Sequence, residues 1–182
     1  RLLSRHELLT SVVLSNMSAV ARAMLHRFVA MQLEGEATAT QSVSLLWESS
    51  EHWYEAADAS RAILLLRRCG LHLIGIGMPQ EAILVLNRAD ALATEPSEKY
   101  SIGADRARAL LRSERPSDAV GVLKTLLSLK SSLHPSPPRL DEVGLMYLQA
   151  SWESGGSLSE IDNRHLDALR ESATLPQDRA EA

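Results

Sequence analysis

Apolar residues recur at three- and four-residue intervals along most of the chain, which is the spacing of amphipathic helices. Ser4 followed by Glu7 predicts a capping box at the start of the first helix, and Gly35 predicts its end. A break between the second and third helices is expected near Ser49 and Ser50. The expected helical ranges are 4–33, about Thr40 to Glu48, and about Glu51 to Gly70.

An internal repeat appears when residues 78–92 are laid over residues 115–129, an offset of 37. Each copy opens with a proline, Pro79 or Pro116, where a first-turn residue needs no N–H partner. In each copy an acid precedes a small residue, Ala82 or Ala119. Each copy also follows another helical stretch, 56–76 or 99–112, so the repeating unit is a helix, a turn and a helix.

These residues resemble the tetratricopeptide repeat family, although the repeats are degenerate. Leu66 and Ala104 stand where the family has tryptophan, Glu114 replaces the turn glycine of the second copy, and the offset exceeds the usual ~34 residues. Small residues at the matching places let paired helices approach closely. The positions that carry the resemblance are Gly70, Leu73, Gly77, Ala82, Leu86, Ala89 and Pro96 in the first copy, and Ala107, Leu110, Ala119, Leu123 and Leu126 in the second.

The predicted fold is all-α, a right-handed TPR-like α-solenoid of antiparallel helix pairs with about seven or eight helices. A third pair is expected from Leu140 to Trp152 and from Leu158 to Leu169. The expected organisation is an N-terminal helical region (1–55), two degenerate TPR-like repeats (56–131), a Pro-rich loop (132–139), a third helix pair (140–172) and a polar tail (173–182).

The composition of the chain limits the kinds of partner and the cellular location that we expect for it. A net charge of −4 gives no basic footprint for direct binding to nucleic acid or to an anionic membrane, and the apolar stretch from Cys69 to Pro79 is too short to span a bilayer. Cys69 is the sole cysteine, which excludes an internal disulfide and favours an intracellular location, cytoplasmic or nuclear. Because the chain opens with Arg1, we interpret it as part of a longer or processed protein.

The sequence carries no catalytic or cofactor motif. Gly70, Gly75 and Gly77 lack the Gly-Lys-Ser/Thr of a phosphate loop, and we interpret them as a helix end and turn. Cys69 and His72 have the spacing of two zinc ligands, but core packing is the favoured interpretation. The stretch 51–55 is interpreted as a helix boundary with a packed Trp53 rather than as the lip of a site. We therefore expect no enzyme activity, metal or cofactor.

The resemblance implies that the first helix of each repeat lines a groove for a peptide or a partner helix. Arg108 and Arg112 lie four residues apart and would present paired donors to a carboxylate, against the alternative of an ordinary solvated arginine face. Leu71 stands where the family's carboxylate clamp needs asparagine. The groove candidates are Leu64, Arg67, Arg68, Leu71, Ile74, Arg108, Leu111 and Arg112.

These observations predict a noncatalytic scaffold or adaptor segment of a larger assembly, which binds a protein partner on the repeat surface. The alternative is a regulatory or sensor domain of a signalling or transcriptional protein, in which the repeats bind a peptide or small effector. A helical enzyme with scattered catalytic residues is a third class, which no motif supports.

Overall fold

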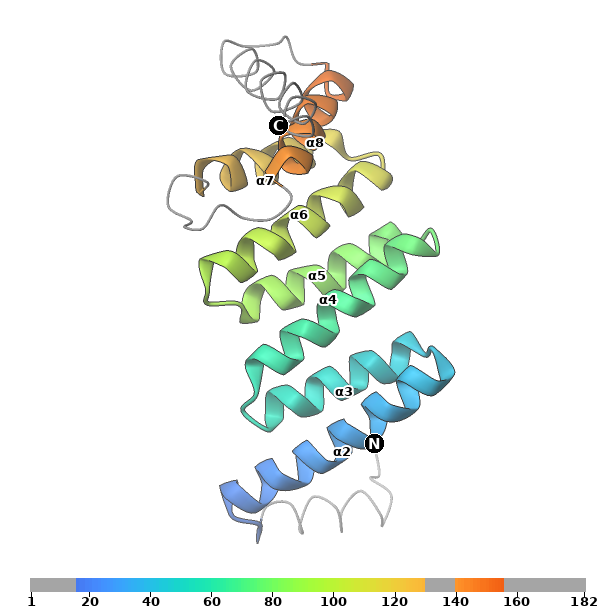
Figure 1. Cartoon of the computed structure of the whole chain (residues 1–182), viewed down its shortest axis with the longest axis vertical. Helices are drawn as coiled ribbons and strands as arrows, with labels where there is room; N and C mark the ends of the chain where they lie inside the picture. The colour runs from blue at the N-terminus through green and yellow to red at the C-terminus, as the bar shows by residue number, and fades with distance from the viewer. Residues whose placement is uncertain (1–15, 130–139, 156–182) are drawn as a thin grey trace, which may run out of the picture.

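The computed structural model describes residues 16–129 and 140–155, which form a stack of helices (Figure 1). The expectations for the Ser4 cap, the Pro-rich loop, the helix from Leu158 and the polar tail lie outside these residues. The helices are α2 (Ala19–Thr40), α3 (Val43–Glu55), α4 (Ala59–Gly75), α5 (Pro79–Leu92), α6 (Pro96–Arg112), α7 (Pro116–Leu129) and α8 (Leu140–Glu153).

A left-handed residue closes the first helix of each successive pair. Gln41, Gly77 and Glu114 all have positive φ, and they recur at intervals of 36 and 37 residues. In each case the following amide donates a hydrogen bond to a carbonyl five residues back, as at Met78 N to Leu73 O (2.8 Å). The same turn geometry therefore joins α2 to α3, α4 to α5 and α6 to α7.

Each helix packs against the next in the chain, and the first helices of successive pairs also touch one another, α4 against α6 and α6 against α8. Among the described residues, the second helices α3, α5 and α7 make no comparable contacts with one another. From α4 onward the stack is therefore tighter on the side of the first helices. The predicted all-α class and the antiparallel, TPR-like helix pairs are confirmed.

Small residues set the distance within the pairs. A Cβ on Gly70 of α4 would lie 2.7 Å from Leu86 Cγ of α5, and a Cβ on Gly103 of α6 would lie 2.7 Å from Leu126 Cδ2 of α7. Ala82 and Leu86 are fully buried. Gly70, Ala82 and Leu86 thus occupy the close-packed positions that the repeat alignment assigned to them.

Two predicted helix boundaries were wrong. No break occurs at Ser49 and Ser50, which lie buried within α3. Ser49 Oγ donates to Ala30 O of α2 (2.9 Å), and Ser50 Oγ donates to Trp47 O of α3 itself (2.6 Å). Their hydroxyls are satisfied by backbone carbonyls, so the two serines act as small packing residues rather than as a stop. The break falls instead at Ala57.

Gly35 likewise does not end the first helix, because α2 continues through it to Thr40 and ends at the left-handed Gln41. The consequence is that α2 and α3 form a helix pair of the same type as the two predicted repeats.

Candidate partner-binding surface

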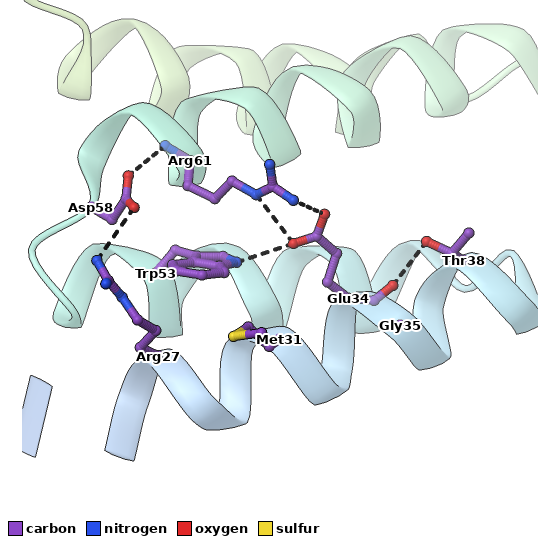
Figure 2. A pocket seen from close by; sticks show the side chains of 8 residues that line it. All are labelled: Arg27, Met31, Glu34, Gly35, Thr38, Trp53, Asp58 and Arg61. Carbon is purple, nitrogen blue, oxygen red and sulfur yellow. Dashed lines mark hydrogen bonds and ion pairs between the residues drawn. The ribbon is translucent and has the colours of Figure 1, made fainter. Parts of the chain in front are cut away.

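An open pocket of about 720 Å³ lies between α2, α3 and α4 (Figure 2). Among the described residues, α4 packs directly against α6, but α2 makes no comparable contact with α4, and the pocket lies at this gap. Its lining residues are Arg27, Met31, Glu34, Gly35 and Thr38 of α2, Trp53 of α3, and Asp58 and Arg61 at the start of α4.

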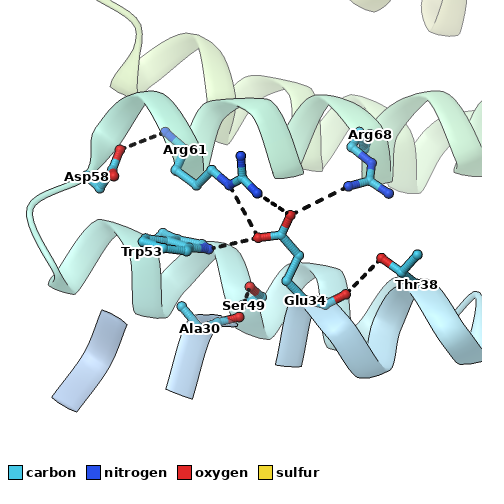
Figure 3. Close-up of polar contacts among 8 residues, drawn as sticks. All are labelled: Ala30, Glu34, Thr38, Ser49, Trp53, Asp58, Arg61 and Arg68. Atoms are coloured by element: carbon cyan, nitrogen blue, oxygen red, sulfur yellow. Dashed lines mark hydrogen bonds and ion pairs between the residues drawn. The ribbon is translucent and has the colours of Figure 1, made fainter. Parts of the chain in front are cut away.

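The carboxylate of Glu34 is the centre of the polar contacts in this pocket (Figure 3). Arg61 donates to it from Nη2 (2.7 Å) and from Nε (3.3 Å), and the indole Nε1 of Trp53 donates at 3.3 Å. Arg68 adds a longer ion pair at 3.8 Å. Because the Glu34 side chain is only 15% exposed, these donors offset the cost of removing its charge from water.

Trp53 forms a wall of the pocket. It lies in the last turn of α3 and is buried, as predicted, while the guanidinium carbons of Arg27 and Arg61 lie 5.9 and 5.8 Å from its ring centroid. Asp58 caps α4 by accepting from Arg61 N (3.1 Å) and forms an ion pair with Arg27 (3.7 Å). The indole is therefore both a packed boundary residue and part of the pocket wall.

The predicted groove residues on α4 divide between surface and core. Leu64 (46% exposed) and Leu71 (39%) lie on its exposed face, and the side chain of Arg68 is 46% exposed. Ile74 is buried in the core, and Leu111 of α6 is half-buried against it. Leu64, Arg68 and Leu71 are thus the predicted groove residues that solvent reaches most freely on α4.

The other three arginines of the predicted groove bond to neighbouring helices. Arg67 of α4 donates twice to Asp105 of α6 (2.7 and 3.1 Å), whose side chain is fully buried. Arg108 pairs with Asp105 (3.7 Å) and with Glu142 of α8. Arg112 donates to Ile74 O at the end of α4 (2.8 Å). Since Arg108 and Arg112 already bond within the chain, the contact with a partner carboxylate that was expected of them stays a prediction.

Cys69 and His72 do not share an environment. Cys69 is fully buried, and burial raises the pKa of its thiol to about 11 despite the opposing effects of the Arg68 charge and a backbone hydrogen bond. His72 is exposed. Within residues 16–129 and 140–155, no group of three or more His, Cys, Asp or Glu side chains has the arrangement to hold a metal ion.

The described helices include none that is both long and apolar enough to cross a membrane.

Comparisons with known proteins found one similar solved structure. No protein-family model matches the sequence, and no curated protein matches it. Among solved structures, the chain is similar to a Podosopora anserina protein assigned as a kinesin light chain with nearly identical TPR-like repeats. The identity is 15%, the TM-score is 0.48, and the match covers 86% of this chain and 96% of that chain.

Proposed function

We propose that the chain is a noncatalytic interaction module that binds a segment of a protein partner on the face formed by α2 and α4. The observation that supports this proposal is the open pocket between these helices, beside exposed apolar residues of both. Met31 (57% exposed), Leu64 and Leu71 offer apolar surface at this face, and the pocket adds charged and indole groups. Apolar anchors beside a few fixed polar groups are typical of protein-binding surfaces.

Site-specific photo-crosslinking tests this proposal. A photo-reactive p-benzoyl-phenylalanine would replace Leu64 or Leu71 in the full chain, which would then be irradiated in lysate from its native source. The matched control carries the same group at Leu84, an exposed leucine of the second helix α5. We expect a discrete crosslinked partner from the two α4 positions and none from Leu84. Equal labelling at Leu84, or no crosslink at either α4 position, would contradict the proposal.

A further inference from the structure

The exposed charge of the α2–α4 face is basic, although the chain as a whole is acidic. The side chains of Arg27, Arg61 and Arg68 are 57%, 44% and 46% exposed, whereas those of Glu34 and Asp58 are 15% and 34% exposed. The guanidiniums therefore meet solvent and the carboxylates lie deeper. We propose, as a refinement that rests on the proposed function, that this face binds an acidic protein segment carrying apolar side chains.

Two of these arginines have donors to spare. Arg61 uses two N–H groups on Glu34 at hydrogen-bond distance. The ion pairs of Arg27 with Asp58 and of Arg68 with Glu34 are 3.7 and 3.8 Å long, beyond the range of a hydrogen bond. A guanidinium has five N–H donors in a planar fork that fits a carboxylate in two-point contact. Arg27 and Arg68 are thus the groups best placed to receive partner carboxylates.

The positions of these arginines define the spacing of the acids. Arg27 lies beside Asp58 and the start of α4, near Arg61, whereas Arg68 lies two turns further along α4 (Figures 2 and 3). Arg68 lies seven positions after Arg61 in α4, which corresponds to a rise of roughly 10 Å along the helix axis. An extended chain covers roughly that distance in three residues. Because the guanidinium carbons of Arg27 and Arg61 lie 5.9 and 5.8 Å from the centroid of the Trp53 ring, acids about three residues apart would reach Arg27 and Arg68. Met31 and Leu64 offer exposed apolar surface to the side chains between those acids.

Glu34 explains why an acidic segment is favoured over a basic one. A lysine entering the pocket would meet a carboxylate that is already bonded to Arg61 and Trp53, and it would lie close to three guanidiniums. An acid at the rim leaves the Glu34 contacts intact. The buried carboxylate thus orients Arg61 and shapes the floor, while the outer arginines face the partner.

Fluorescence anisotropy with two synthetic peptides tests this inference. The first carries Asp at every third position with Leu and Ser between, and the second carries Lys in place of each Asp. We expect the intact chain to bind the Asp peptide more tightly, with an affinity that falls as salt is raised. Arg27→Glu combined with Arg68→Glu should weaken that binding by roughly tenfold or more.

The control is Arg115→Glu, which makes the same kind of charge change at an arginine of similar exposure (54%) that forms an ion pair with Asp118. Its affinity should stay within about twofold of the parent, because the residue lies outside the pocket. Circular dichroism would show that all variants keep their helices.

Three outcomes would overturn the acidic-segment inference: equal or tighter binding of the Lys peptide, unchanged affinity in the double charge reversal, or tighter binding of a single-stranded oligonucleotide that the same variant abolishes. If one of these occurs while Leu64 still crosslinks a partner, the charge preference fails and the proposed function stands. Absence of a crosslink at both Leu64 and Leu71 would remove the proposed function itself.

Discussion

At the scale of single residues, glycine has opposite effects at different positions in these helices. Gly70 lies against Leu86, whose side chain is fully buried. A methyl group on Gly121 of α7 would instead point into open space, with no neighbouring helix of the described chain within 4 Å. The first glycine is required by a helix contact, and the second costs helix stability without any packing gain.

We therefore expect Gly70→Ala and Gly121→Ala to change stability in opposite directions. Gly70→Ala should destabilise the chain by about 1 to 3 kcal/mol through overpacking, reduced by the better helix propensity of alanine. Gly121→Ala should stabilise it by up to about 1 kcal/mol. Urea unfolding followed by circular dichroism measures both. A stabilising Gly70→Ala would show that the α4–α5 contact is looser than the structure indicates.

Cys69 gives a pH-dependent prediction. Its folded-state pKa is raised to about 11 by burial, so the native state keeps the thiol protonated where the unfolded chain has lost the proton. The stability that this thiol contributes is present below the unfolded pKa of about 8.5 and falls as the pH rises towards the folded pKa.

Relative to Cys69→Ala, the intact chain should lose about 1 to 2 kcal/mol of unfolding free energy between pH 8 and pH 10. Urea titrations of both proteins at the two pH values measure this difference, and the variant removes the contribution of other titrating groups. Parallel pH dependences of the two proteins would mean that the native thiol ionises normally.

At the scale of helices and turns, different residues form the same turn in each pair. Gly77 and Glu114 both adopt positive φ (81° and 58°) at the same point of the turn, but a side chain there has a conformational cost. Glu114→Gly should therefore stabilise the chain by about 1 kcal/mol, and Gly77→Ala should destabilise it by about as much. Thermal unfolding of the two variants is the measurement, and the same sign for both would contradict the shared turn geometry.

The ion pairs of Asp105 connect α6 to α4 and, through Arg108, to α8. Its fully buried carboxylate accepts two hydrogen bonds from Arg67 of α4 and pairs with Arg108, which reaches Glu142 of α8. Asp105→Ala should destabilise the chain by on the order of 3 kcal/mol, since it leaves two partly buried guanidiniums facing each other. Asp118→Ala removes an exposed pair with Arg115 and should cost under about 1 kcal/mol. Comparable losses in the two variants would mean that the buried network does not couple the helices.

The repeats were predictable where the residues repeat. Proline at the helix start and alanine at the close contact recur in 79–82 and 116–119, so the sequence revealed α4 to α7 as two pairs. The α2–α3 pair was missed because Gln41 makes its turn, and glutamine does not signal a left-handed turn position. The turn geometry recurs along the chain, whereas the residues that form it change.

The pocket could not be predicted for the same reason. Without α2 recognised as a first helix, nothing in the sequence indicated that Glu34 would meet Arg61, which lies 27 residues further along the chain. The arginines chosen from helical spacing, Arg108 and Arg112, share a face but bond to adjacent helices. Spacing identifies which side chains lie on one face, whereas their partners depend on how neighbouring repeats are stacked.

At the scale of the whole molecule, the contacts between the first helices of successive pairs are uneven. The first helices α4 and α6 are in direct contact and are joined by the Arg67–Asp105 pair and by the Arg112 hydrogen bond to Ile74 O. Between α2 and α4 the described contacts are mainly side-chain bonds around an open pocket. Among the described residues, α2 is therefore held to the next pair only by these side-chain bonds and through α3, which packs against α4. In a linear array each element is stabilised mainly by its immediate neighbours, so α2 should open before α4 and α6.

Hydrogen exchange should therefore show less protection for the amides of α2 than for those of α6, each compared at the middle of the helix. Because the proposed partner segment contacts both α2 and α4, saturating the chain with the Asp peptide should raise protection of these two helices while changing α7 little. The Arg27→Glu and Arg68→Glu double variant, given the same peptide, serves as the control and should show no such increase. Protection in α2 equal to that in α6 without peptide would contradict the earlier opening of α2. A rise in protection that is spread evenly over α2 to α7 would instead mean that the helices open together as one unit. In that case the pocket would be a gap in the packing, and α2 would not open separately.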